Sequence, residues 1–127
     1  MNKEIAKEFL ENPNMPKLRE TDKLKCDSPL TIYECLNALK MFKNNKSPGT
    51  DGFTAEFYKF FWSDISDIVL RSLLYAFDNN RLSIDQRRGI ISLIPKKEKS
   101  RTLLKNWRPL SLLNIDYKIL AKVVALR

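Results

Sequence analysis

Cationic side chains gather toward the carboxyl end of the sequence, where Lys96, Lys97 and Arg108 flank two short apolar runs. Arginine offers planar, bidentate hydrogen bonds to phosphate oxygens, whereas lysine acts as a mobile point charge. In the stretch KNWRPLSLLN, Arg108 lies between Trp107 and Pro109, which restricts its backbone and makes it the better candidate for a defined phosphate contact. The alternatives are a surface ion pair for Arg108, solvation for the lysines, and core packing rather than base stacking for Trp107.

A second candidate is the stretch KNNKSPGTDG, residues 43–52, in which two lysines precede two glycines. Glycine permits φ > 0, and such a loop can point backbone N–H groups at a phosphate. The Gly-Lys-Ser/Thr order of a Walker loop is absent, so a plain turn between helices is the simpler interpretation. We expect Asp51 to cap that turn rather than to act in catalysis.

The carboxylates and thiols predict neither a catalytic residue nor a metal site. Asp64 and Asp67 are three residues apart on an expected helix, where a solvated role near the positive end of the helix dipole is the simplest explanation. Two-metal chemistry needs clustered carboxylates, and no Asp-Asp pair occurs. The absence of histidine excludes Ser/His and Cys/His pairs, and Cys26 and Cys35 are expected to be free thiols.

The net charge of +8 is concentrated in the last third of the chain. Residues 87–127 contain eleven Lys/Arg and two Asp/Glu, whereas the preceding residues are nearly balanced. This block favours a polyanionic partner, nucleic acid or nucleotide before membrane, although a solvated basic face is the alternative. No apolar run approaches the roughly 18 residues of a membrane span, and no signal peptide is evident. We therefore expect an intracellular protein, in the cytoplasm or the nucleus, without a membrane partner.

The elements that position these residues follow from caps and hydrophobic periodicity. Residues 1–30 are interpreted as a charged leader or linker with a short helix over residues 2–10, and residues 31–127 as one domain. A capping box of Thr31 and Glu34 opens a helix that ends at the loop of residues 43–52. Thr54 and Ser63 are expected to cap two further helices. The apolar residues of the second of these helices are expected to lie on one face; they are Ile65, Ile68, Val69, Leu73, Ala76 and Phe77.

The pattern then changes to strands. GIISLIPKK and NWRPLSLL are β-rich runs separated by a polar stretch, which predicts a hairpin with a long loop. NIDYKILAKVVALR returns to helical spacing, and no stop signal follows Leu126, so Arg127 is expected to be a truncation point. The predicted class is α+β, with a mainly helical N-terminal part, a β-hairpin and a C-terminal helix. The last helix should bury Ile115, Ile119, Leu120, Val123 and Val124.

Three blocks of the sequence resemble consecutive blocks of the reverse transcriptases of non-LTR, LINE-type retrotransposons, in order and spacing. They are NNKSPGTDGFTAEFYKFFW, GIISLIPKK and NWRPLSLLNIDYKILAKVVALR, and the resemblance runs from about Thr31 to Arg127. It implies the start of the fingers of a right-hand polymerase, whose hairpin folds over the incoming nucleotide. The residues it assigns to the triphosphate are Lys96, Lys97 and Arg108, and those it assigns to the template RNA are Lys46, Ser47, Gly49, Asp51 and Gly52.

The resemblance also implies partners that lie outside this sequence. They are an RNA template, a deoxynucleoside triphosphate, the missing palm and thumb domains, and Mg²⁺ for the complete polymerase, with no cofactor in this chain. The metal-binding carboxylates of the family lie just downstream of Arg127 and in a later Tyr-x-Asp-Asp box, and neither block is present. We expect a truncated RNA-directed DNA polymerase fragment that is inactive alone. The alternatives are a standalone basic nucleic-acid-binding module and a decayed open reading frame without function.

Overall fold

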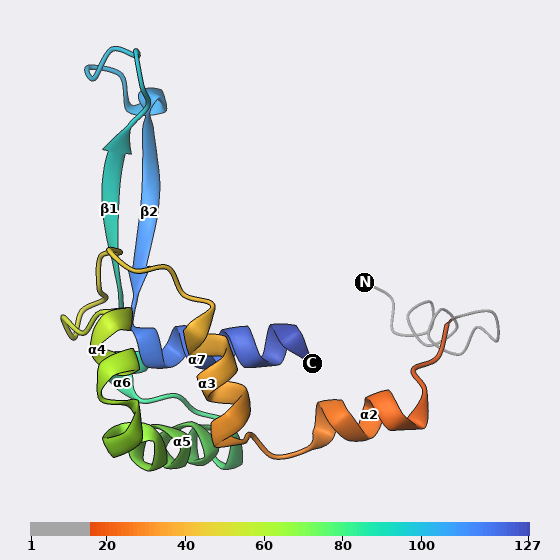
Figure 1. Ribbon diagram of the computed structural model, residues 1–127. Helices are drawn as coiled ribbons and strands as arrows, with labels where there is room; N and C mark the ends of the chain where they lie inside the picture. Colours follow the sequence, from red (N-terminus) through yellow and green to blue (C-terminus); the bar gives the residue numbers. More distant parts are fainter. Residues whose placement is uncertain (1–15) are drawn as a thin grey trace.

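The computed structural model describes residues 16–127, and Figure 1 shows a body of helices from which a long β-hairpin projects. This arrangement confirms the predicted α+β class. The helix expected over residues 2–10 lies outside the described residues. Among the helices that the structure describes, none is long and apolar enough to cross a membrane. In chain order the elements are α2 (Glu20–Asp27), α3 (Ile32–Lys40), α4 (Ala55–Phe60), α5 (Trp62–Asp78), α6 (Ile84–Arg87), β1 (Gly89–Pro95), a 3₁₀ turn (Leu104–Asn106), β2 (Trp107–Leu113) and α7 (Ile115–Leu126).

Two of the three predicted helix caps are confirmed. The capping box at α3 is complete: Thr31 Oγ1 accepts a hydrogen bond from the Glu34 amide at 3.2 Å, and Glu34 Oε2 accepts one from the Thr31 amide at 3.0 Å. Thr54 Oγ1 accepts from the third amide of α4 at 3.4 Å. Ser63 is not a cap, because α5 already begins at Trp62. The backbone barely breaks between α4 and α5, since the Phe61 amide still donates to the Phe57 carbonyl, so no free helix end is left to cap.

Two short helices were not predicted. Helix α2 stands where an irregular linker was expected, and it buries no residue. Figure 1 shows it beside the body rather than within it. Helix α6 has only four residues and carries its own capping box, in which the Ser83 hydroxyl accepts from the Gln86 amide and the Gln86 side chain accepts from the Ser83 amide. Helices this short give no readable periodicity, so the sequence pattern could not separate them from loops.

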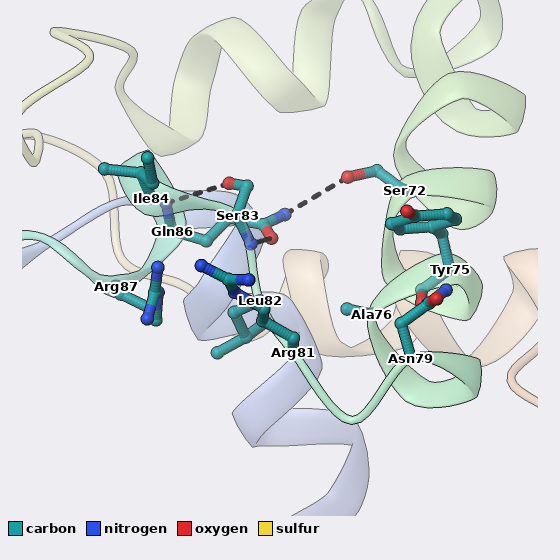
Figure 2. A pocket seen from close by; sticks show the side chains of 10 residues that line it. All are labelled: Ser72, Tyr75, Ala76, Asn79, Arg81, Leu82, Ser83, Ile84, Gln86 and Arg87. Carbon is teal, nitrogen blue, oxygen red and sulfur yellow. Dashed lines mark hydrogen bonds between the residues drawn. The ribbon is translucent and has the colours of Figure 1, made fainter.

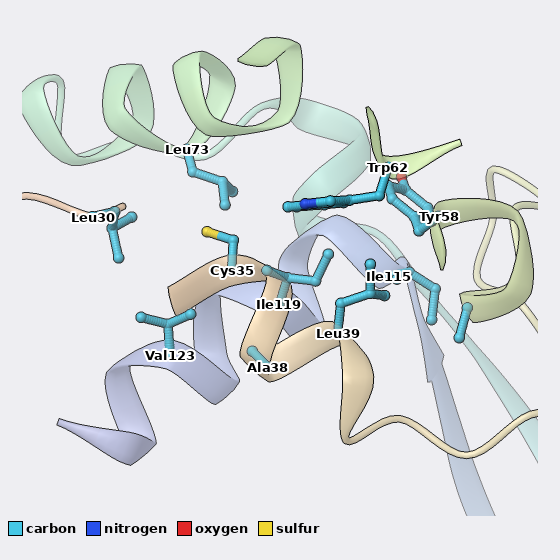
Figure 3. Packing of buried hydrophobic residues seen from close by; sticks show 11 residues of the cluster. Leu30, Cys35, Ala38, Leu39, Tyr58, Trp62, Leu73, Ile115, Ile119 and Val123 are labelled. Carbon is cyan, nitrogen blue, oxygen red and sulfur yellow. The ribbon is translucent and has the colours of Figure 1, made fainter. Parts of the chain in front are cut away.

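The core lies where α3 meets α4, α5 and α7 (Figure 3). Leu39, Leu73 and Ile119 are completely buried there. The predicted apolar faces were too wide, because Ile68 is 61% exposed and Val124 is 52% exposed. Helix α5 packs mainly on α3 and α4 and leaves its other side to solvent, so only part of its stripe is covered. The buried cluster consists of Leu30, Cys35, Ala38, Leu39, Ala55, Tyr58, Trp62, Leu73, Ile115, Ile119 and Val123.

The hairpin is confirmed as an antiparallel pair in which Gly89 lies opposite Leu113 and Pro95 lies opposite Trp107. The two strands form a sheet of their own, and none of their residues is buried. An isolated two-stranded hairpin is only marginally stable in water. Its position therefore depends on how its two ends are fixed to the body.

Candidate nucleic-acid and nucleotide interface

The residues predicted to contact the triphosphate meet at the tip of the hairpin. Strand pairing places Arg108 opposite Ile94, next to the point where β1 runs into the loop. A hollow of about 420 Å³ opens there, lined by Ile94, Pro95, Lys96, Lys97, Lys99 and Arg108. Four of its six lining residues are cationic. The hollow can therefore accept a phosphate-rich anion, with the apolar pair forming its floor.

Hydrogen bonds close the loop behind this hollow. Lys96 Nζ donates to the Lys105 carbonyl at 2.8 Å, and the Lys96 amide donates to the Asn106 carbonyl at 2.7 Å. Trp107 Nε1 donates to the Arg101 carbonyl at 3.0 Å. Trp107 is half-buried, and it holds the loop against the strand rather than packing in the core. Lys96 is similarly committed to loop closure, which leaves Lys97 and Arg108 as the cations with more freedom to reach a ligand.

Arg108 is exposed, and it forms no ion pair within the part of the chain that the structure describes. The surface ion pair considered as its alternative role is therefore not observed in residues 16–127. An exposed guanidinium held on a strand has its charge available and its direction fixed by the backbone. This combination suits bidentate contact with phosphate oxygens.

The backbone amides at the end of the loop of residues 43–52 are not free to bind an anion. Consecutive backbone amides are used inside the protein: Asp51 N donates to Asn114 Oδ1 at 3.4 Å, Gly52 N to the Gly49 carbonyl at 3.4 Å, and Phe53 N to Asp51 Oδ1 at 3.0 Å. The last bond confirms that Asp51 caps the turn. Gly52 has a φ of +76°, as expected of a glycine in a turn.

Gly49 has a different role from the one expected, because close packing and not a positive φ requires a glycine there. A Cβ at this position would lie 2.1 Å from Asn114 Oδ1 and 2.4 Å from the Asn114 amide nitrogen. Gly49 is accordingly buried, whereas Lys46 and Ser47 are exposed. Of the five residues predicted to contact the template, these two therefore present their side chains most openly to solvent.

A buried polar cluster at the root of the hairpin was missed by the sequence analysis. Asn114, 2% exposed, follows β2 and accepts a hydrogen bond from the Thr50 hydroxyl at 3.1 Å. Its Nδ2 donates to the Asp85 carbonyl in α6 at 3.1 Å. Asn114 thus ties the loop of residues 43–52 to the two segments that flank the hairpin, α6 before β1 and the residue directly after β2. Its sequence signal, an asparagine before an apolar helix, is the same as that of an ordinary helix start.

Gln86, which is 5% exposed, forms a second set of buried hydrogen bonds at the root of the hairpin. Its Nε2 donates to Asp116 Oδ2 at 2.9 Å and to the Ser72 hydroxyl at 3.2 Å. These bonds join α6 to α5 and to α7. The helices that precede and follow the hairpin are therefore held in one position relative to each other. Fully satisfied buried networks of this kind fix one geometry.

Electrostatics at the root differ from those at the tip. Burial raises the pKa of Asp51, and the negative charge of Asp116 adds to that shift. Burial also raises the pKa of the Tyr58 hydroxyl, with smaller contributions from Asp116 and Asp51. A cation bound beside Asp51 and Asp116 would offset their negative charge. Residues 16–127, however, contain no group of three or more carboxylate, thiol or imidazole side chains that could hold a metal ion. Asp64 and Asp67 are exposed, as expected.

The two thiols are free, as predicted. Cys26 is exposed, and Cys35 is completely buried in the core. Burial raises the pKa of Cys35 to about 11, which leaves it a poor nucleophile at neutral pH.

The two predicted contact sets lie at opposite ends of the hairpin. Arg108 is the second residue of β2, and Leu113, the last, adjoins Asn114 and hence the loop of residues 43–52. The five-residue separation corresponds to about 17 Å along a strand at about 3.4 Å per residue. One extended ligand could reach both sets, whereas a single phosphate could not.

Comparison with known proteins connects the chain to mobile genetic elements. No protein-family model matches the sequence. The chain is similar to the uncharacterized 149 kDa protein of transposon TX1 from Xenopus laevis, with 45% identity over 113 residues that cover 89% of this chain. The chain spans only 9% of the length of that relative. It is thus related to one segment of a transposon-encoded protein.

Proposed function

We propose that this chain is the fingers portion of a LINE-type, RNA-directed DNA polymerase and contributes contacts to the template RNA and to the incoming deoxynucleoside triphosphate. The proposal rests on one observation above all: Lys96, Lys97 and Arg108, which are separated by up to twelve positions in the sequence, line one hollow at the tip of the hairpin. In this assignment residues 31–127 are the fingers domain, and residues 1–30 lead into it.

The relationship to a transposon-encoded protein supports this proposal independently of the hollow. The 45% identity extends over 113 residues, 89% of this chain. A transposon that moves through RNA needs a polymerase that holds template and nucleotide together, and a hairpin with basic residues at its tip fits the nucleotide part of that task. Lys46 and Ser47, beside the root of the hairpin, fit the template part.

The chemistry that this chain supplies is electrostatic positioning. Arg108 donates to phosphate oxygens, and Lys97 and Lys99 neutralise further negative charge. Forming a phosphodiester bond requires Mg²⁺ held by clustered carboxylates. The described residues do not fit that metal, since they contain no such group. The metal and its ligands therefore belong to other parts of the polymerase, and no bond-forming step is assigned to these residues.

Nucleotide binding tests the proposal directly. A fluorescently labelled deoxynucleoside triphosphate should bind the chain, and Arg108→Ala should weaken that binding about tenfold, the usual loss for one charge-assisted hydrogen bond. Arg71→Ala is the matched control, because Arg71 is an exposed arginine on α5, far along the chain from the hairpin. Equal losses in both variants would show that only net charge matters and would contradict the assignment.

Polymerase assays provide a second test. The chain mixed with primer, RNA template, deoxynucleotides and Mg²⁺ should incorporate no nucleotide. Measurable incorporation by the purified chain would overturn the view that it supplies positioning only, because it would require metal ligands that residues 16–127 do not form.

The charge distribution favours one other function, a standalone nucleic-acid-binding module. Eleven of the 23 basic residues lie in the last third of the chain, with only two acidic residues among them. This module would bind RNA with an affinity that falls steeply with salt, and it would not discriminate triphosphates from other anions. Strong RNA binding together with no measurable nucleotide binding would favour it over the polymerase fragment, and a flat salt dependence would argue against it.

A further inference from the structure

A second positively charged hollow lies between α5 and α6, away from the hairpin tip (Figures 1 and 2). Its volume is about 470 Å³, within the range of about 300–1,000 Å³ of small-molecule sites. One wall comes from Ser72 and Tyr75 in the carboxyl-terminal half of α5 and from Asn79 directly after it. The other comes from the following turn and α6, with Arg81 and Arg87.

Neither arginine of this hollow is neutralised by an ion pair in the part of the chain that the structure describes. Arg81 and Arg87 form no ion pair within residues 16–127, where the observed pairs are Arg88 with Asp85 and Arg127 with Glu34. The carboxylate closest in sequence to Arg87 is thus already engaged by Arg88. Both arginines also line an adjoining hollow of about 420 Å³. Two unpaired guanidinium groups beside one cavity repel each other, and an anion between them would relieve that repulsion.

The opposite wall offers a flat aromatic surface. Tyr75 is 68% exposed although it lies on an amphipathic helix, and Figure 2 shows its ring on the α5 side of the hollow, seen nearly edge-on. The neighbouring Asn79 donates from Nδ2 to the backbone carbonyl of Tyr75 at 2.8 Å, which ties down the carboxyl end of α5. Exposed tyrosine rings stack on nucleobases, and this stacking is tolerant of base identity.

The base of the hollow is rigid. Gln86 is buried and fixed by hydrogen bonds to Ser72, Ser83 and Asp116, so the backbone that carries Arg87 has one position. The Ser72 hydroxyl accepts from Gln86 Nε2 at 3.2 Å and keeps its own proton to donate to a ligand. The two arginines and the tyrosine therefore line a hollow whose base is already fixed.

We propose that this hollow binds one nucleotide unit of single-stranded RNA, with a phosphate between Arg81 and Arg87 and the base stacked on Tyr75. An acidic peptide would satisfy the arginines but would leave the aromatic wall unused. The site is separate from the triphosphate contacts proposed for the hairpin and does not depend on them. It gives the chain a second RNA contact at the end of the body remote from the hairpin tip.

Fluorescence anisotropy with a labelled twelve-nucleotide oligouridylate and the full chain tests the site. The double variant Arg81→Ala/Arg87→Ala should weaken binding at least tenfold and should reduce the slope of log affinity against log salt by about one or more, as expected when phosphate contacts are lost. The matched control is Arg71→Ala/Arg88→Ala, which removes the same charge outside the hollow. Equal losses of RNA affinity in the two double variants would overturn the proposed site, because the affinity would then depend only on the net charge of the chain.

Stacking and charge can be separated at Tyr75. Tyr75→Ala should weaken binding about fivefold or more with an unchanged salt slope, whereas Tyr75→Phe should bind like the parent chain. A Tyr75→Ala variant that binds normally would overturn the aromatic half of the site. Circular dichroism of each variant checks that the fold is retained, and folding is expected to survive because all these side chains are exposed.

Two further measurements exclude other occupants. RNA containing 4-thiouridine should cross-link to the peptide that contains Tyr75, and the cross-link should persist in Arg108→Ala. Loss of the cross-link in that hairpin variant would show that the hollow is not an independent site. Competition by polyglutamate as effective as competition by unlabelled oligouridylate would overturn RNA as the occupant in favour of an acidic peptide.

Discussion

Leu39 in α3 is completely buried, whereas Ile91 in β1 remains 69% exposed, although both are aliphatic residues in regular structure. The difference divides the molecule into a body that buries its apolar surface and a hairpin that does not. Burial of apolar area is the main source of folding free energy. The buried core therefore stabilises the body, whereas the hairpin depends on its attachment to the body for stability. The cations predicted to bind the nucleotide lie on the hairpin, the region with little buried apolar surface of its own.

The attachment between the two regions is polar. Asn114 and Gln86 are almost completely buried, and their hydrogen bonds join the root of the hairpin to α5, α6 and the loop of residues 43–52. Polar contacts require defined directions, whereas apolar contacts do not. The body therefore supplies stability, and the polar root supplies the direction in which the hairpin projects.

The largest effect on stability is expected from a change in the core of the body. Leu39→Ala should lower the free energy of unfolding by about 3 to 4 kcal/mol, because it removes buried atoms and leaves a cavity among α3, α4, α5 and α7. Ile91→Ala should cost less than about 0.5 kcal/mol, as for other exposed positions. Urea unfolding followed by circular dichroism measures both. Similar losses would show that the strands are covered in solution.

The attachment itself can be tested at two glycines of one loop. Gly49→Ala should cost about 2 kcal/mol or more, because its Cβ would overlap backbone atoms of Asn114 that cannot move aside. Gly52→Ala should cost only about 1 kcal/mol, the usual penalty for a positive φ, since no atom lies within 4 Å of the added carbon. Thermal unfolding compares the two variants. A larger loss at Gly52 would contradict the close packing at the hairpin root.

A smaller effect is expected where α7 meets the start of α3. Arg127 Nε donates to Glu34 Oε1 at 2.9 Å, and this contact holds the pKa of Glu34 below its ordinary value of 4.5. A carboxylate with a lowered pKa in the folded state stabilises it at pH above about 4.5, and this contribution is lost as the pH falls through the folded pKa. Glu34→Gln should cost about 1 kcal/mol at pH 7.

The pH dependence is the sharper measurement at this position. Below pH 4.5 the stability of the parent chain should approach that of Glu34→Gln, because protonation removes the same charge. Urea unfolding at pH 7 and at pH 3 gives the four values needed. A difference between the two proteins that stays constant with pH would contradict a role for the carboxylate charge.

The smallest effect on stability is expected at the hairpin tip. Trp107→Phe removes the hydrogen bond from Nε1 to the Arg101 carbonyl but touches no core residue, so the free energy of unfolding should change by less than about 0.5 kcal/mol. The local effect should be larger: amide exchange at Lys96, whose N–H donates to the Asn106 carbonyl, should become faster. Unchanged exchange would show that the indole does not hold the loop.

Much of the fold could be predicted because its signals are local. The capping box of Thr31 and Glu34, the cap at Thr54 and the paired β-rich runs each depend on residues within a few positions of one another. The same local rule failed at Ser63, since a cap is needed only where a helix end is free. It also failed for α2 and α6, which are too short to show a period.

The candidate site could be predicted in part. The sequence identified the cations at the hairpin, and strand pairing explains why Arg108 approaches Lys97. It gave no indication that Lys96 and Trp107 are committed to closing the loop. It also missed the hollow between α5 and α6, because Tyr75, Arg81 and Arg87 form a surface only after the chain turns back at residues 79–83.

By itself the sequence determined the class of fold and the position of the hairpin, since helix caps and strand propensity are properties of neighbouring residues. Only the tertiary structure decided which of these residues stay exposed and which are committed to the fold. Gly49 and Asn114 are 65 positions apart, and their contact arises because α6 and the hairpin bring the chain back to the same place. Packing and directed hydrogen bonds between distant residues have no signature in a local pattern.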